Sequence, residues 1–221
     1  MSVRHSSIRN IWNKTLLENI PSSLKLNILD NIHKSSKILD IGCGNGDDLL
    51  ALREQGFTEL FGIDVNRELV KSTKKLLGKH INISVQDATN LKFSDECFDY
   101  AIAKALLTVL VSDTSIKKCL REAYRVLKPG GILQIEDFFQ NWHLELYRDR
   151  YLKYSKELGI KCTFPVYDNQ NNLKYYARHF NVMDISILLI KVGFYIEKIE
   201  FKEVKTQSGN KVIGFTIVAK K

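Results

Sequence analysis

The sequence lacks the features that mark secreted, zinc-binding or membrane-spanning proteins. Its four cysteines form no C-x-x-C pair, so we expect neither a disulfide framework nor a metal site. The N-terminus has no apolar signal region, and the longest apolar runs fall well short of the roughly 20 residues that cross a bilayer. These absences predict a reduced, cytoplasmic protein with no membrane partner.

Long runs of like charge are also absent, although the chain is basic overall. It carries a net charge of +8, and its lysines are scattered in ones and twos with no run of five or more. This pattern favours a lysine-rich solvated surface over a nucleic-acid groove, and a nucleic-acid partner remains the alternative. A length of 221 residues fits one domain, residues 1–221, as a monomer or a homodimer.

The stretch KILDIGCGNG at residues 37–46 is the most informative part of the chain. Its first five residues form a short β-branched apolar run typical of a buried parallel strand, and alternate glycines and an apolar-periodic helix follow. Glycines at such a turn let a ligand approach the backbone, where the N–H groups that open the helix have no partners of their own. This order of strand, glycine turn and helix predicts a ligand site.

The spacing and charge of the turn argue against a dinucleotide. The dinucleotide fingerprint G-x-G-x-x-G requires a third glycine where this chain has Asp47. A pyrophosphate would also meet the carboxylates of Asp40, Asp47 and Asp48, with only the helix dipole to oppose the repulsion. A cationic ligand fits the turn better.

The pattern D-x-G-x-G-x-G, formed by Asp40, Gly42, Gly44 and Gly46, resembles motif I of the class I S-adenosylmethionine-dependent methyltransferases. In that family the cofactor carries a sulfonium and an amino group near this turn, which accounts for the acidic loop. The resemblance implies S-adenosyl-L-methionine as the cofactor. It also implies an α/β, Rossmann-like fold with a seven-stranded, mostly parallel sheet that ends in an antiparallel C-terminal hairpin.

The rest of the chain fits that fold. Residues 1–34 are predicted to form an N-terminal helical arm, with helices at 12–19 and 21–32. The last two strands flank the turn QSGN and form a hairpin by alternation. Predicted strands cover residues 37–41, 59–65, 81–85, 98–103, 132–138, 194–204 and 212–220, and predicted helices of the sheet domain cover residues 47–56, 67–77 and 113–127.

Acidic residues follow the second and third predicted strands. Asp64 can accept hydrogen bonds from both ribose hydroxyls, a bidentate arrangement that suits a carboxylate, or it caps the next helix. The resemblance implies that Asp87, in the family's third motif, accepts from the adenine amino group; alone it would be a turn residue. The expected cofactor contacts are Asp40, Gly42, Cys43, Gly44, Gly46, Asp64, Val65, Asp87, Ala88 and Lys104.

The resemblance places the end of the fourth strand, at Lys104, beside the transferred methyl group. This position has neither the N/D-P-P-Y motif of many N-methyltransferases nor the carboxylate ligand of the metal-dependent catechol O-methyltransferases, and a cation there would repel a divalent metal. Lys104 could orient an anionic substrate group or extend into solvent. The stretch REAYRVLKPGG at residues 121–131 resembles the small-molecule branch, which includes ubiquinone and menaquinone C-methyltransferases.

Residues 138–193 remain as an insertion between the fifth and sixth strands. Half of the chain's aromatic residues lie between Phe138 and Phe180. In this fold such a segment covers the carboxyl edge of the sheet, where ligands bind, so we predict that it forms a small substrate cap.

Candidate reacting groups lie within this predicted cap. His143 and His179 are candidate bases because histidine titrates near neutral pH, and each also has a structural interpretation. Arg178 could hold a substrate carboxylate or phosphate, or form a surface salt bridge. The candidate substrate contacts are Trp142, Tyr176 and Arg178.

The sequence therefore predicts methyl transfer to an oxygen, nitrogen or carbon atom of a small molecule by direct in-line displacement. Positioning in a dry pocket supplies much of the rate enhancement in such a reaction, so no shared catalytic constellation is required. Two alternatives remain: an RNA methyltransferase, in which the aromatics stack on bases, and a non-catalytic cofactor-binding protein.

Overall fold

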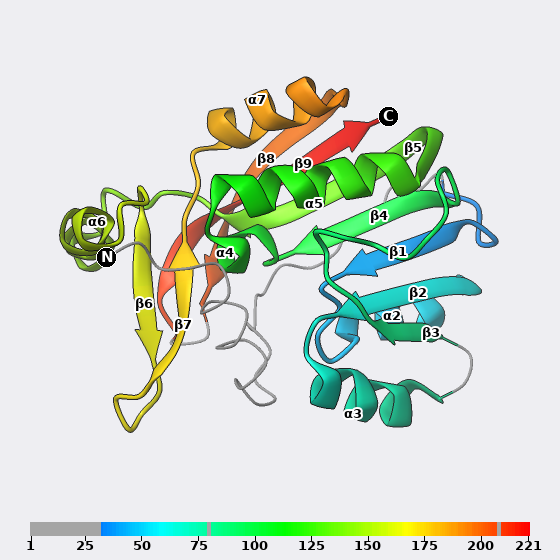
Figure 1. The fold of residues 1–221 in the computed structure, drawn as a ribbon, viewed down its shortest axis with the longest axis horizontal. Helices are drawn as coiled ribbons and strands as arrows, with labels where there is room; N and C mark the ends of the chain where they lie inside the picture. The colour runs from blue at the N-terminus through cyan, green and yellow to red at the C-terminus, as the bar shows by residue number, and fades with distance from the viewer. Residues whose placement is uncertain (1–31, 79–80, 207–208) are drawn as a thin grey trace.

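The computed structural model describes residues 32–78, 81–206 and 209–221, which form a mixed α/β fold (Figure 1). Seven strands make one sheet in the order β3-β2-β1-β4-β5-β9-β8, and β6 and β7 pair as a separate hairpin. The predicted helices at 12–19 and 21–32 lie outside the described residues, except for residue 32.

The strands and helices of the sheet domain match the predicted ones within a few residues. The largest difference is at β5, which begins early because Leu127 pairs with Phe98 before a register shift. The strands are β1 (Lys37–Ile41), β2 (Glu59–Asp64), β3 (Asn82–Val85), β4 (Phe98–Lys104), β5 (Leu127–Phe138), β6 (Thr163–Tyr167), β7 (Leu173–Arg178), β8 (Tyr195–Lys205) and β9 (Lys211–Lys220). The helices are α2 (Asp47–Glu54), α3 (Arg67–Leu77), α4 (Leu107–Leu110), α5 (Asp113–Val126), α6 (Glu145–Leu158) and α7 (Val182–Val192).

The direction of the strands confirms the predicted Rossmann-like sheet. β1 pairs in parallel with β2 and β4, β2 with β3, and β4 with β5. β9 then runs antiparallel to both β5 and β8, which is the predicted C-terminal hairpin. Because the five parallel strands share one direction, their carboxyl ends meet at one edge of the sheet.

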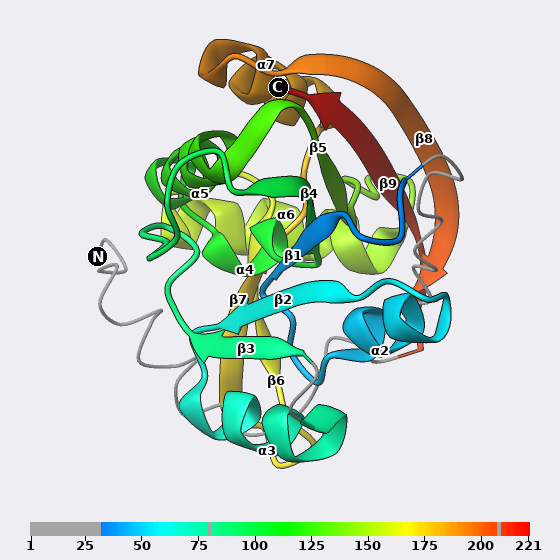
Figure 2. The ribbon, with the colours of Figure 1, turned by 90° about the vertical axis from the view of Figure 1, so that its right-hand side faces the viewer.

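Helices cover both faces of this sheet, and in Figure 2 α5 and α2 lie on opposite sides of it. On one face, α5 and α7 bury apolar side chains against β1, β4, β5 and β9. On the other face, α2 and α3 pack against β1, β2 and β3. The central strands β1 and β4 are therefore buried on both faces, which explains their apolar sequences.

The helix α7 belongs to the core of the sheet, although it lies within the segment predicted to be the cap. Its residues Val182, Ile185 and Leu189 are buried in the same hydrophobic cluster as the strands. Of residues 138–193, this leaves α6 and the β6–β7 hairpin as the part that stands apart from the sheet.

The hairpin and α6 form a separate aromatic cluster at the carboxyl edge. In Figure 1 the arrowheads of β1 and β4 point towards the β6–β7 hairpin. Tyr175 and Ala177 of β7 pack with Tyr147 and Tyr151 of α6, and β7 also lies beside α4. Because side chains alternate along a strand, Tyr176 points to the opposite face of the hairpin.

Candidate active site

Three left-handed glycines shape the turn between β1 and α2. The φ angles of Gly42, Gly44 and Gly46 are 83°, 51° and 77°, a region in which other residues are strained. The N–H groups of Gly42 and Cys43 both donate to the carbonyl oxygen of Ile63, at 2.8 and 2.9 Å. The end of β2 therefore holds the turn in place.

Close packing on α3 fixes the far end of the turn. A Cβ atom on Gly46 would lie 2.5 Å from Leu77 Cδ1 and 2.8 Å from Thr73 Cγ2. Thr73 also donates from its hydroxyl to the carbonyl oxygen of Gly44 at 2.9 Å. This contact explains the last glycine of the motif by packing between α2 and α3.

Asp64 links the end of β2 to the glycine turn. Its Oδ2 atom accepts from the N–H of Gly44 at 3.2 Å, and its Oδ1 atom accepts from the N–H of Asn66 at 2.8 Å. Burial raises the pKa of this carboxyl group, and the backbone donors oppose that rise. The side chain of Asn66 caps α3 by accepting from the N–H of Leu69, so Asp64 is free of that role. The contact of Asp64 with ribose hydroxyls remains a prediction.

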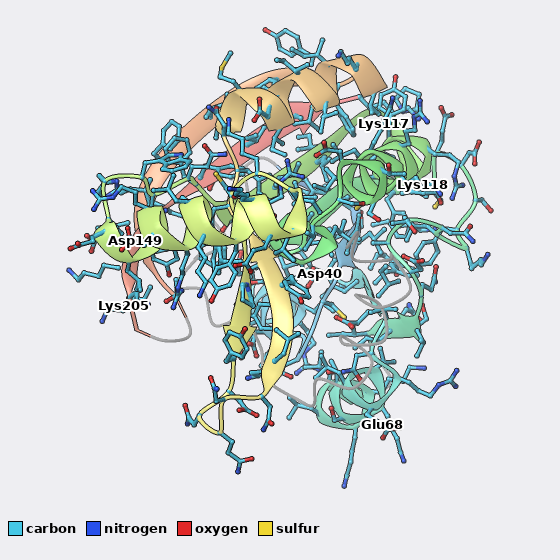
Figure 3. All side chains as sticks on the ribbon, turned by 60° about the vertical axis from the view of Figure 1, so that its left-hand side comes forward. Asp40, Glu68, Lys117, Lys118, Asp149 and Lys205 are labelled. Atoms are coloured by element: carbon cyan, nitrogen blue, oxygen red, sulfur yellow. The ribbon has the colours of Figure 1, made fainter. Side chains whose placement is uncertain are left out.

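Acidic groups and one lysine gather around the turn. Asp40 is only 2% exposed, and its pKa is raised well above its usual value by burial and by the nearby carboxylate of Asp48. Lys104 donates from Nζ to Asp48 Oδ1 at 2.5 Å and lowers the pKa of Asp40. Figure 3 shows Asp40 in the interior, whereas the labelled Glu68 and Lys205 lie at the periphery.

The charges of this cluster fit the predicted cofactor. Asp40 is also repelled by Asp47 and Asp64, so three carboxylates disfavour its ionised form while Lys104 alone opposes them. A ligand with a sulfonium and an ammonium group would offset this repulsion, whereas a pyrophosphate would add to it. The residues present therefore fit S-adenosylmethionine.

The ion pair gives Lys104 a different partner from those predicted. The sequence left a choice between an anionic substrate group and solvent. In the structure the ammonium group bonds to Asp48, a residue 56 positions away, and both side chains are largely buried. Lys104 is thus part of the glycine-turn site.

The predicted adenine side of the site is a turn after β3. Asp87 accepts at Oδ1 from the N–H of Thr89 at 3.0 Å, and Ala88 is buried in the core. The N–H of Gln86 donates to the carbonyl oxygen of Asp64 at 3.0 Å, so this turn lies beside the ribose candidate. An open hollow next to it is lined by Asp87, Thr89, Asn90, Lys118, Arg121 and Glu122.

Two further predicted contacts act through their backbone. The thiol of Cys43 is buried against β2, where a Cβ atom on Gly62 would lie 2.9 Å from the sulfur. The N–H of Val65 donates to the carboxylate of Asp64. The Cys43 side chain thus packs against β2, and Val65 positions the acid before it; contact of either residue with the cofactor remains a prediction.

His179 does not have the surroundings of a general base. It is 3% exposed, its Nδ1 atom lies 2.6 Å from the hydroxyl of Tyr151, and its ring stacks on Phe138. Burial lowers the pKa of His179 to about 3, so it stays neutral near pH 7 with one ring nitrogen already bonded. The candidate base is here a packing residue between α6 and β7.

His143 and Trp142 lie on the surface before α6. His143 is exposed, whereas Trp142 is 40% exposed and donates from Nε1 to Gln140 at 3.2 Å. The Trp142 ring meets that of Tyr151 edge to face, with centroids 4.9 Å apart. Both residues remain candidates for substrate contact.

Arg178 is engaged by the protein itself. Its Nη1 atom donates to the carbonyl oxygen of Val111 at 2.8 Å and to Asp113 at 2.6 Å, and its guanidinium lies over the ring of Phe180. The structure thus shows a salt bridge, which was the alternative to anion binding, and the anion-binding role of Arg178 remains a prediction. The neighbouring Tyr176 has no such bond among the described residues and stays a substrate candidate.

Sequence analysis missed two acidic residues in β5. Asp137 is fully buried, and Glu136 is buried and paired with Lys202 at 3.3 Å. The signal available was a pair of acids inside the apolar run ILQIEDFF, a position where charges are rare without partners.

Two structural searches of the described residues gave negative results. No cluster of three or more histidine, cysteine, aspartate or glutamate side chains in them could hold a metal ion. No helix in the same part of the chain is long and apolar enough to span a membrane.

Comparisons with known proteins identify the family of the chain. Residues 38–131 match the family model described as a methyltransferase domain. A ubiquinone/menaquinone biosynthesis C-methyltransferase of Rickettsia felis is 30% identical over 186 residues, which cover 77% of this chain and 72% of that protein. A tRNA (carboxymethyluridine(34)-5-O)-methyltransferase of Arabidopsis thaliana is 37% identical over 107 residues, which cover 48% of this chain and 25% of that protein.

The fold has a solved relative of similar size. The crystal structure of a SAM-dependent methyltransferase from Methanosarcina mazei superposes with a TM-score of 0.82 at 33% identity, covering 89% of this chain and 99% of that chain. The match covers most of this chain, and the glycine turn lies inside the matched family domain. The chain belongs to the class I S-adenosylmethionine-dependent methyltransferases, and its cofactor is S-adenosylmethionine.

Proposed function

We propose that the protein transfers the methyl group of S-adenosylmethionine to a small-molecule acceptor bound between the glycine turn and the β6–β7 hairpin. The observation that carries this proposal is the aromatic hairpin at the carboxyl edge of the sheet, beside α4. A capped edge excludes water and encloses an acceptor, which suits a small molecule better than a large folded one.

The chain's own residues hold the cofactor in this proposal. The backbone of the glycine turn and the carboxylates of Asp40 and Asp64 surround its positive groups and ribose, and Asp87 reaches the adenine. When bound, the cofactor supplies an electrophilic methyl group that passes to the acceptor in one displacement. Correct placement of the acceptor contributes on the order of 7 to 11 kcal/mol to such a reaction.

The face of the hairpin that points away from α6 is the proposed acceptor surface. Tyr176 lies opposite Pro165 in the β6–β7 pair, and its pKa is raised by burial and by the nearby Tyr167. Two tyrosine rings and a proline make a flat apolar surface, which fits a planar aromatic acceptor. A relative named for ubiquinone and menaquinone biosynthesis agrees with this chemistry.

The acceptor either ionises by its own acidity and needs no base, or His143, the exposed histidine near the cap, acts as the general base. His179 suits this role poorly, because burial lowers its pKa to about 3, which makes it a weak base, and its Nδ1 atom is bonded to Tyr151. An acceptor with an acidic phenol or enol ionises near neutral pH and needs little help, whereas a neutral amine or alcohol requires a base.

Binding and turnover with a panel of acceptors test the proposal. The protein is titrated with S-adenosylmethionine and S-adenosylhomocysteine, and labelled methyl transfer is then followed to small phenols, quinols and amines. Transfer that falls at least tenfold in Tyr176→Ala but not in Tyr195→Ala, an exposed tyrosine on the edge strand β8, supports it. Equal rates in the two variants contradict the hairpin as the acceptor surface.

The alternatives predict different outcomes in the same assay. An RNA methyltransferase transfers to folded RNA at low salt and loses that activity at high salt, because counterion release drives its binding. The plant relative that acts on tRNA shares only 25% of its own length with this chain, so the match covers the common domain. Tight cofactor binding without transfer to any acceptor in the panel or a lysate indicates a non-catalytic protein.

A further inference from the structure

The loop that follows β4 is held in an unusual backbone conformation. Ala105 and Val111, at its two ends, have φ angles of 50° and 57°, although neither is glycine. Such a conformation is strained for a residue with a Cβ atom and persists only when the surroundings impose it. The contacts that impose this conformation indicate the role of the loop.

One wall of the glycine turn is made by this loop. A Cβ atom placed on Gly42 would lie 3.0 Å from Leu106 Cδ1, so the leucine side chain rests against the first glycine of the turn. The N–H of Ala105 donates to the carbonyl oxygen of Glu136 at 2.8 Å, which fixes the start of the loop on β5. A shift of the loop would therefore change the shape of the cofactor site.

Asp137 is the buried group that fastens the loop. Its side chain is fully buried, and its Oδ2 atom accepts from the N–H of Thr108 at 3.0 Å. It also accepts from the N–H of Leu107, and its Oδ1 atom accepts from the N–H of Phe138 at 2.8 Å. The carboxylate thus satisfies the first N–H groups of α4, which a helix cannot satisfy internally.

The other end of the loop is tied to the cap. Thr108 donates from its hydroxyl to the carbonyl oxygen of Arg178 at 2.9 Å. Arg178 in turn donates to the carbonyl oxygen of Val111 at 2.8 Å. The loop is therefore held on one side by β5 and on the other by β7, the strand that carries the hairpin.

We propose that Asp137 is a positioning residue for cofactor binding: it fixes residues 105–111 so that Leu106 packs against the glycine turn. It touches neither cofactor nor acceptor. Its acceptor oxygens, and not its charge, perform this role, because backbone N–H groups are its partners. The inference rests on the cofactor site alone and does not depend on the identity of the acceptor.

Calorimetric titration of the full chain with S-adenosylmethionine tests this inference. Asp137→Ala leaves buried N–H groups without acceptors, and affinity should fall about tenfold or more. Asp137→Asn can keep a carbonyl oxygen on the N–H groups of α4, although its NH2 group then faces the N–H of Phe138, so affinity should fall less than in the alanine variant. Amide exchange of residues 105–111 should quicken in the alanine variant only.

A matched control separates positioning from general loss of stability. Leu189 is fully buried in the hydrophobic cluster that also contains Leu106, but it lies on α7. Leu189→Ala should therefore lower the melting temperature and leave cofactor affinity unchanged. Leu106→Ala removes the contact with the glycine turn without touching the acid, and should weaken cofactor binding in a folded protein.

Three results would overturn the inference. The first is wild-type affinity in a folded Asp137→Ala variant, and the second is an equal loss in Leu189→Ala. The third applies if Asp137→Ala does not fold. Unchanged cofactor affinity in Leu106→Ala would then show that the contact between residues 105–111 and the glycine turn does not affect cofactor binding.

Discussion

The carboxylate of Asp64 has two roles that together determine its expected contribution to cofactor binding. It holds the N–H groups of Gly44 and Asn66, and it faces the site where a ribose is expected. We expect Asp64→Ala to weaken S-adenosylmethionine binding by about 1 to 3 kcal/mol through lost charged hydrogen bonds. Calorimetric titration measures this, and unchanged affinity in a folded variant would refute the ribose assignment.

The ion pair between Lys104 and Asp48 sets the charge of the cofactor site. Removing the cation in Lys104→Met leaves Asp40 and Asp48 with no positive group to oppose their repulsion. S-adenosylmethionine is a sulfonium cation, whereas S-adenosylhomocysteine has a neutral sulfur. The variant should therefore shift the ratio of their affinities towards S-adenosylmethionine by about 1 kcal/mol, since the two ligands share their other charged groups and differ in charge only at sulfur.

Both ligands are titrated into both proteins to measure that ratio. Lys198→Met is the control, because Lys198 pairs with Glu200 on the exposed strand β8 and lies outside the site. A ratio that stays the same in Lys104→Met, or that moves equally in the control, contradicts the electrostatic account.

The packing of α2 on α3 determines how much an alanine substitution destabilises the protein at each of the two glycines that flank α2. Gly46 and Gly56 both have positive φ angles, of 77° and 92°, so alanine is strained at each. Only at Gly46 would the new Cβ atom meet other side chains, at 2.5 Å from Leu77, whereas nothing lies within 4 Å at Gly56. Gly46→Ala should cost at least about 2 kcal/mol more of unfolding free energy than Gly56→Ala.

Urea denaturation of the two variants tests that difference. The pair shares one chemical change and one backbone region, so the comparison isolates the clash with α3. Equal destabilisation would show that backbone strain alone fixes the glycine at position 46.

The pH dependence of stability belongs to the whole molecule, because several buried groups titrate together. Burial raises the pKa of Asp137 to about 7, far above its value of about 4 in the unfolded chain. The native state therefore binds this proton more tightly, and the stability it contributes is lost as pH rises through 7. Lowering the pH from 7 to 5 should stabilise the wild type relative to Asp137→Asn by about 1.4 kcal/mol per unit.

The variant is needed because another group acts in the opposite direction. His179 has its pKa lowered to about 3, so its contribution is lost as pH falls below about 6.5. Asp137→Asn leaves that histidine in place, and the difference between the two proteins cancels its effect. A constant difference between pH 5 and pH 7 would show that Asp137 does not titrate in that window.

The grouping of the glycine turn with its acids could be predicted from the sequence because its signals are local. The glycine turn, its acids and the acid after β2 are each defined by a short stretch whose backbone geometry depends on neighbouring residues. The apolar periods of the strands and helices likewise indicated the sheet, because the central strands β1 and β4 are buried on both faces. The turn and the acids lie at one edge of the sheet because they follow strands that run in the same direction.

The environment of single side chains could not be predicted in this way. Lys104 meets Asp48 across 56 positions, and Arg178 meets Val111 across 67, so neither partner is near in sequence. His179 and Arg178 lie within three residues of Tyr176, yet their surroundings differ. His179 is buried and bonded to Tyr151 of α6, whereas Arg178 bonds to Val111 and Asp113.

The sequence by itself determined the family, the cofactor and the sheet, because glycine conformation, charge and apolar period are properties of short segments. Only the tertiary structure decided that α7 belongs to the core, that His179 is a packing residue and that Asp137 fastens the loop beside the glycine turn. Those outcomes depend on contacts between distant segments, and the free energy of a buried polar group is set by the partners that folding brings to it.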